Sequence, residues 1–176
     1  MVYCIAKGGA RVDYTHRYES PLGGITLASD GESLIGLWFD GQKYFAAGLD
    51  ETSIEKALPV FGLAERWLDL YFGGSAPDHV PPLRPRGTAF QQAVWQALLT
   101  VPFGHTATYG EIARALAAQR GLARLSARAV GGAVSRNPVS IIIPCHRVLG
   151  ADGGLTGYAG GAEKKAWLLA HEHAGA

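Results

Sequence analysis

Three residues that could do chemistry together stand next to one another at Cys145, His146 and Arg147. In cysteine chemistry the nucleophile is the thiolate, and a neighbouring imidazole and a fixed positive charge both favour it over the thiol. The alternative is an inert cysteine of the core, because free cysteine is among the most buried residue types. Two titratable or charged neighbours favour the reactive cysteine over the structural one.

The segment in front of Cys145 should position the thiol. Ile141, Ile142 and Ile143 are apolar and β-branched, which predicts a short buried strand, and Pro144 should end its pairing. Successive side chains of an extended chain point to opposite faces, so His146 can reach Cys145 only through a turn or a bridging water. Cysteine hydrolases usually take their histidine from a distant part of the chain, which argues against a hydrolase.

Length and composition limit the possible classes. A chain of 176 residues with 48% hydrophobic and 18% charged residues is a soluble globular protein of one domain or two small ones. No apolar stretch approaches the ~20 residues that cross a membrane, and residues 1–12 lack the apolar centre of a signal peptide. Cys4 and Cys145 form no disulfide framework, and Cys4 alone supplies no metal site. We therefore expect no cofactor, no metal, no membrane partner and a reducing, cytoplasmic location.

The net charge of +1 hides an asymmetry along the chain. Residues 1–82 hold 6 basic and 11 acidic residues, whereas residues 83–176 hold 10 and 4. Between positions 112 and 151 there is no acidic residue but there are six arginines: Arg114, Arg120, Arg124, Arg128, Arg136 and Arg147. A long run of one sign predicts a surface that binds a polyanion.

The first half of the chain predicts a small sheet covered by a helix. Residues 13–19, 24–29 and 33–39 are apolar or alternate, and Asp30-Gly31 is a hairpin turn signal. Residues 62–72 have Leu63, Trp67, Leu70 and Tyr71 at helical spacing. Residues 73–87 hold four of the nine prolines and predict a linker.

The second half predicts helices. Thr88 with Gln91 and Thr108 with Glu111 fit capping boxes, and a third helix should begin near Ser126. The helices after Thr108 and Ser126, joined by a glycine-containing turn, predict a helix-turn-helix. Residues 153–161 are rich in glycine and predict a mobile lid before a last helix.

The motif PCHRV, with NPVSIIIP before it and LTGYAGG after it, resembles the active-site signature of the O6-alkylguanine-DNA alkyltransferases. This resemblance to the methylated-DNA–protein-cysteine methyltransferases covers about residues 88–172, and the N-terminal part is similar only in its hairpin pattern. It implies an α/β (α+β) fold with two domains. Residues 1–78 would form a ribonuclease-H-like domain, and residues 88–176 would form the DNA-binding and alkyl-transfer domain.

The resemblance also implies roles for individual residues. Cys145 would accept the alkyl group, His146 would take its proton through a water, and Glu172 would support the imidazole. Tyr109 would protonate the departing guanine, and Asn137 would brace the turn before the cysteine. The residues expected to contact DNA are Ala127, Arg128, Ala129, Gly131 and Arg147. Those expected to line the substrate pocket are Ser140, Val148, Thr156, Tyr158 and Ala159.

The reaction that these residues imply is displacement at a saturated carbon, which leaves a thioether on the protein. Because water has no carbonyl to attack, each molecule would act once. The expected partner is double-stranded DNA containing O6-alkylguanine, entered from the minor groove with the base flipped out. The protein would act as a monomer near the nucleoid, or in the nucleus of a eukaryote. The alternatives are a lesion sensor without chemistry, whose relatives have tryptophan in place of the cysteine, and a cysteine hydrolase.

Overall fold

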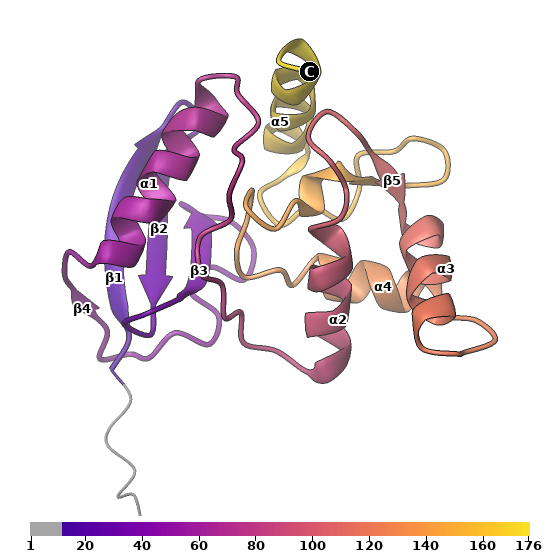
Figure 1. Ribbon diagram of the computed structural model, residues 1–176, viewed down its shortest axis with the longest axis horizontal. Helices are drawn as coiled ribbons and strands as arrows, with labels where there is room; N and C mark the ends of the chain where they lie inside the picture. The colour runs from indigo at the N-terminus through magenta and orange to yellow at the C-terminus, as the bar shows by residue number, and fades with distance from the viewer. Residues whose placement is uncertain (1–11) are drawn as a thin grey trace, which may run out of the picture.

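The computed structural model describes residues 12–176, which form two packed units joined by a segment without helix (Figure 1). The N-terminal unit, residues 12–72, is a sheet with one helix. The C-terminal unit, residues 88–176, is mostly helical. The predicted α+β fold is confirmed, while Cys4 lies outside the described residues. None of the helices in this part of the chain is long and apolar enough to cross a membrane.

The N-terminal sheet has four strands in the order β3-β2-β1-β4. The three predicted strands are present as β1 (Tyr14–Ser20), β2 (Gly23–Ser29) and β3 (Leu34–Phe39), and β2 pairs antiparallel with both β1 and β3. The fourth, β4 (Ile54–Glu55), pairs parallel with β1 and was not predicted, because two residues carry no periodic signal.

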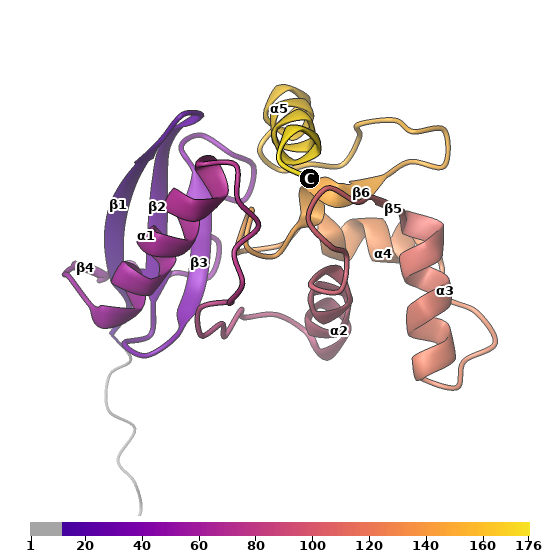
Figure 2. The ribbon, with the colours of Figure 1, turned by 45° about the horizontal axis from the view of Figure 1, so that its top comes forward.

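Helix α1 (Pro59–Phe72) covers one face of this sheet (Figure 2). It begins three residues before the predicted start, because Pro59 occupies the first turn, where a missing N–H costs nothing. Leu70 was predicted to face the core but is 44% exposed. The buried face is formed instead by Val60, Phe61, Ala64, Trp67, Leu68 and Tyr71.

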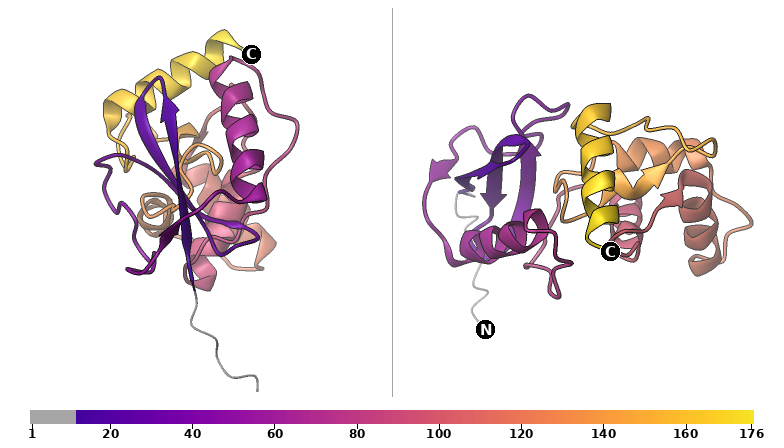
Figure 3. Two further views of the ribbon diagram at one scale, coloured as in Figure 1. Left: turned by 90° about the vertical axis from the view of Figure 1, so that its left-hand side faces the viewer. Right: turned by 90° about the horizontal axis from the view of Figure 1, so that it is seen from above.

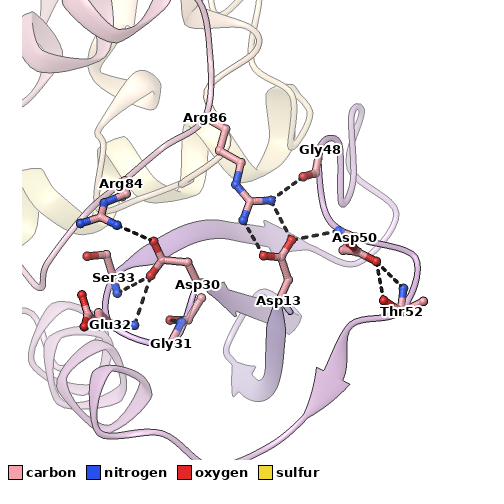
Figure 4. A network of polar contacts seen from close by, with 11 residues as sticks. Asp13, Asp30, Gly31, Glu32, Ser33, Gly48, Asp50, Thr52, Arg84 and Arg86 are labelled. Carbon is pink, nitrogen blue, oxygen red and sulfur yellow. Dashed lines mark hydrogen bonds and ion pairs between the residues drawn. The ribbon is translucent and has the colours of Figure 1, made fainter. Parts of the chain in front are cut away.

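The predicted linker is held against the N-terminal unit along the edge of β3. Leu34 donates its backbone N–H to Pro82, and its carbonyl accepts from Arg84, both at 2.8 Å. Two arginine side chains add to this contact (Figure 4). Arg84 binds Asp30 at 3.1 Å, and Arg86 binds both oxygens of the fully buried Asp13, at 2.7 and 2.5 Å. The ion pair between Arg86 and the buried Asp13 holds the end of the linker in one position on the N-terminal unit, and thereby sets where the C-terminal unit starts.

The C-terminal unit consists of four helices and a two-stranded parallel sheet. The predicted capping boxes at Thr88 and Thr108 are confirmed, and Ser126 caps the third helix. The helices are α2 (Ala89–Leu98), α3 (Tyr109–Gln119), α4 (Ala127–Val134) and α5 (Ala162–Ala174). The strands are β5 (Ala107–Thr108) and β6 (Val148–Leu149).

The isoleucine segment before the cysteine is not a strand, contrary to prediction. It is fully buried, but Ile141 has a φ of +67° and the chain turns there. The reason lies in Asn137, whose amide donates to the carbonyls of Val139 (3.2 Å) and Ile143 (2.8 Å). Those carbonyls therefore need no neighbouring strand, and only Val139 forms a single bridge, to Leu37 of β3.

One hydrophobic core runs through both units, and α5 lies over their junction (Figure 3). His171 of α5 is 2.7 Å from the carbonyl oxygen of Tyr71 at the end of α1. The rings of Trp167 and His171 stack at 4.7 Å, and both lie against Phe72. The end of α1 is thus packed directly against the helix that carries Glu172.

Candidate active site

Cys145 opens a single turn of 3₁₀ helix, Cys145–Arg147, directly after Pro144. Its free thiol is 4% exposed, and the sulfur accepts a hydrogen bond from the Asn137 amide at 3.0 Å. Asn137 also accepts from the backbone N–H of Val139 at 3.0 Å. One side chain therefore joins the segment that follows α4 to the sulfur, and the bracing role of Asn137 stays a prediction.

The thiol itself is not favoured as a thiolate, contrary to the expectation from its neighbours. Burial raises the pKa of Cys145 to about 11, although the hydrogen bond from Asn137 and the charge of Lys165 act in the opposite direction. The resting side chain is a neutral thiol at pH 7. Any nucleophilic chemistry at Cys145 therefore requires a base within the site.

His146 and Glu172 form a buried pair that can supply this base. The Nε2 atom of His146 lies 2.6 Å from Oε1 of Glu172. Since an ionised carboxylate only accepts hydrogen bonds, Nε2 carries the proton and Nδ1 is the free acceptor. Nδ1 is buried and has no partner among the described residues. Burial lowers the pKa of His146, against the opposing effect of Glu172, so the resting imidazole is neutral and can accept a proton.

Glu172 is 1% exposed and is surrounded by hydrogen-bond donors. Oε1 accepts from His146, from Arg147 at 3.0 Å and from the Tyr71 hydroxyl at 2.8 Å. Oε2 accepts from Arg147 at 2.8 Å and from the backbone of Gly104 at 3.1 Å. Burial alone would raise the pKa of Glu172, but the hydrogen bonds from His146 and Arg147 outweigh it and hold the pKa at about 2.

The position of Arg147 contradicts its predicted contact with DNA. Its side chain is buried, and its guanidinium binds Glu172 and, at 2.6 Å, the carbonyl of Val101. A guanidinium that is satisfied inside the protein is not available to a phosphate. The other five arginines of the acid-free stretch are exposed: Arg114, Arg120, Arg124, Arg128 and Arg136.

Two polar residues of the site were missed by sequence reasoning. Tyr71 was predicted only as an inward residue of its helix, and nothing in the sequence links it to Glu172. Lys165 is fully buried, and its ammonium donates to the carbonyls of Val148 (2.6 Å) and Thr156 (3.0 Å). The helical repeat is the signal that could have identified Lys165, because this residue lies on the same face of α5 as Glu172.

The glycine-rich loop after β6 lies over the hydroxyl of Tyr109. Tyr109 is half-buried and donates to the carbonyl of Thr156 at 2.9 Å. Gly157 has a φ of +78°, and a Cβ there would stand 2.5 Å from the Tyr109 hydroxyl, so only glycine fits. Next to this contact is a hollow of about 750 Å³, with Arg128, Gly131, Tyr109 and Thr156 among its lining residues.

The predicted pocket residues have three different sets of neighbours. Val148 and Thr156 both contact Lys165, as described above, and the Tyr158 ring lies edge-on to His146 at 6.4 Å. Ser140 and Ala159 instead contact the N-terminal unit. The Ser140 hydroxyl donates to Gln42 at 3.2 Å, and the Ala159 carbonyl accepts from the backbone of Lys43 at 3.0 Å.

Helix α4 presents an exposed face with almost no side chains. Ala127, Arg128 and Ala129 are exposed, and Gly131 is half-buried beside the Tyr109 ring. Another surface can therefore approach the backbone of α4 closely, with Arg128 as the projecting side chain. Among residues 12–176, no group of three or more His, Cys, Asp or Glu side chains could hold a metal ion.

Two family models match this chain and together span most of it. Residues 14–84 match the ribonuclease-like domain of 6-O-methylguanine DNA methyltransferase, and residues 89–174 match its DNA-binding domain. The boundary between the two matches falls at the end of the segment that was predicted as a linker.

Relatives and solved structures agree with the family models. A methylated-DNA–protein-cysteine methyltransferase of Haemophilus influenzae is 45% identical over 157 residues, which are 89% of this chain and 83% of that protein. One from Mycobacterium leprae is 46% identical over 154 residues, covering 86% of this chain and 87% of that protein. A crystal structure of Mycobacterium tuberculosis OGT in complex with DNA has a TM-score of 0.78 and 43% identity, and covers 94% of each chain.

Proposed function

The chain belongs to the 6-O-methylguanine DNA methyltransferase family, and we propose on this basis that it repairs DNA by moving the alkyl group of O6-alkylguanine onto Cys145. It is a methylated-DNA–protein-cysteine methyltransferase in this reaction, used once per molecule. The observation that carries the proposal is the buried array in which Asn137 holds the sulfur and Glu172 holds His146 with Nδ1 open.

The proposed reaction moves one proton and one alkyl group. The Cys145 proton passes to Nδ1 of His146, through a bridging water, and Glu172 stabilises the imidazolium that forms. The sulfur then attacks the alkyl carbon as its bond to guanine O6 breaks, and the electron pair of that bond stays with the base. Tyr109 donates a hydrogen bond to the departing guanine. The thioether product has no route back to the thiol, which explains the single use.

We propose that α3 and α4 act as a helix-turn-helix that places α4 in the minor groove. The small residues Ala127, Ala129 and Gly131 allow the close approach, and Arg128 fills the space left by the flipped base. The exposed arginines of this unit supply the contacts to phosphate. The division into domains 1–78 and 88–176, action as a monomer, and a cytoplasmic location near the nucleoid belong to the same proposal.

Intact-mass measurement before and after incubation with duplex DNA containing O6-methylguanine tests the proposal directly. We expect a gain of one methyl per molecule, located in the peptide that contains Cys145. Cys145→Ser should still bind the duplex but gain no mass, because a serine hydroxyl is far harder to ionise. Several turnovers per molecule, or a methyl group found only on Cys4, would refute the assignment.

A further inference from the structure

Tyr71, at the end of α1, reaches the His146–Glu172 pair from the N-terminal unit. Its side chain is fully buried, and its hydroxyl donates to Oε1 of Glu172 at 2.8 Å. Oε1 is the same oxygen that accepts from Nε2 of His146, and the Tyr71 hydroxyl lies 3.4 Å from that nitrogen. One carboxylate oxygen is therefore shared by a residue of each unit.

The ring of Tyr71 is held on several sides, so its hydroxyl has a fixed direction. Trp67 stacks on it at 5.3 Å with an interplanar angle of 9°. Phe72 and Phe103 meet it edge-on at 5.4 and 5.9 Å, and His171 lies 5.6 Å away. A buried hydroxyl needs an acceptor in any case, and the acceptor of this one is the carboxylate oxygen that also binds the proposed base.

We propose that Tyr71 is a positioning residue for alkyl transfer, through which the N-terminal unit fixes the hydrogen bond between Glu172 and His146. This inference rests on the proposed function of Cys145. By donating to Oε1, Tyr71 holds the carboxylate oxygen in line with Nε2 and withdraws part of its charge. Nε2 then keeps its proton, and Nδ1 stays available to the thiol.

The sign of the effect follows from the charges around His146. The groups that face it are Cys145 and Arg147 from its own turn, Glu172 and Lys165 from α5, Tyr71 from α1, and Tyr158 from the glycine-rich loop. Tyr71 stays neutral at any working pH, because burial and the nearby Glu172 raise its pKa. Without its hydroxyl, Glu172 carries more charge, the imidazolium is stabilised, and the pKa of His146 rises. The imidazole is then neutral only at higher pH.

Two matched substitutions separate this role from packing. Tyr71→Phe removes only the hydroxyl and keeps the stacked ring. Tyr18→Phe is the control. The Tyr18 hydroxyl likewise donates to a carboxylate, that of Asp69 on α1 at 2.8 Å, but it has no contact with His146. Both variants of the full chain are assayed for single-turnover methyl transfer from duplex DNA between pH 5 and 9. DNA binding and thermal unfolding are measured alongside.

For Tyr71→Phe we expect the acidic limb of the rate profile to move to higher pH, so that the loss of rate is largest at pH 5 and smallest at pH 9. Nitrogen-15 NMR of the His146 ring should show protonation of the imidazole at a higher pH than in the wild type. Tyr18→Phe should leave both measurements unchanged. A profile that keeps its shape, or a loss that Tyr18→Phe reproduces, overturns the proposal. If the wild type transfers no methyl, the proposed function fails, while the NMR measurement still decides the role of Tyr71.

Discussion

Replacing Glu172 by glutamine is the most informative single change to the buried array. The substitution keeps the shape of the side chain but removes its charge and one acceptor. The amide nitrogen that replaces an oxygen would face donors, either His146 or Arg147. Arg147 would then remain buried, with only the Val101 carbonyl and the glutamine oxygen to accept its hydrogen bonds.

Two independent arguments give the same size for the loss of stability. The pKa of Glu172 falls from its ordinary value of 4.5 to about 2 on folding, which corresponds to roughly 3 kcal/mol at neutral pH. Breaking a buried ion pair by removing one partner costs about 3–5 kcal/mol. For a chain of this length, each kcal/mol lowers the melting temperature by about 2–4 °C, so we expect a drop of roughly 6–20 °C.

The pH dependence gives a second, sharper measurement. Because the folded pKa of Glu172 is depressed, its contribution is fully present above pH 4.5 and is lost as the pH falls toward about 2. The difference in unfolding free energy between wild type and Glu172→Gln should therefore be largest near pH 7 and should shrink below pH 4.5. Urea unfolding at a series of pH values measures this difference, in which the effects of all other carboxylates cancel.

Two outcomes would refute this account of Glu172. One is a difference of less than about 1 kcal/mol at pH 7, which would mean that Arg147 and His146 do not depend on the carboxylate. The other is a large difference that stays constant down to pH 3, which would mean that packing rather than charge is lost. Methyl transfer by the folded variant should also fall, because the imidazolium of His146 has lost its counter-charge.

Two further predictions concern DNA and the substrate pocket. Arg128→Ala should slow repair of a lesion in duplex DNA more than repair of a free base or a frayed end. The difference in activation free energy should be at most a few kcal/mol, the scale of unstacking one base. Equal slowing on all substrates would make Arg128 merely structural. Free O6-benzylguanine should inactivate the protein poorly, because Ser140 offers no apolar ring to the adduct and β-branched Thr156 narrows the mouth of the pocket. Competition between this base and methylated duplex DNA measures the effect, and loss of methyl transfer within minutes at micromolar base would contradict it.

The features that the sequence predicted correctly are those with a local physical cause. The capping boxes at Thr88 and Thr108 need only side chains three residues apart, and they form as expected. The strands of the N-terminal hairpins follow from alternation and turn residues. Cys145, His146 and Glu172 could be grouped only through the family resemblance, because α5 brings Glu172 to His146 from 26 residues away.

The errors arose where a side chain, nearby or distant in the sequence, took the place of the expected partner. The isoleucine segment has the composition of a strand, but Asn137 satisfies its carbonyls and the chain turns instead. Arg147 belongs to an acid-free stretch and was expected on the surface, but Glu172 draws it inward. Tyr71 reaches the same carboxylate across 101 positions of sequence, and no pattern within α1 records that contact.

The burial of Cys145 suits a protein that is used once. Burial raises the pKa of Cys145 to about 11, and the side chain is 4% exposed, so stray electrophiles find little thiolate to attack at pH 7. Many reactive cysteines are stabilised as thiolates in the resting protein. Such a thiolate would react with these electrophiles and inactivate the protein before it met its target. In the proposed mechanism His146 has its own carboxylate and an open Nδ1, so the proton of Cys145 can leave when an alkyl group is bound. The same burial that slows the reaction of the thiol with other electrophiles therefore keeps it available for the target base.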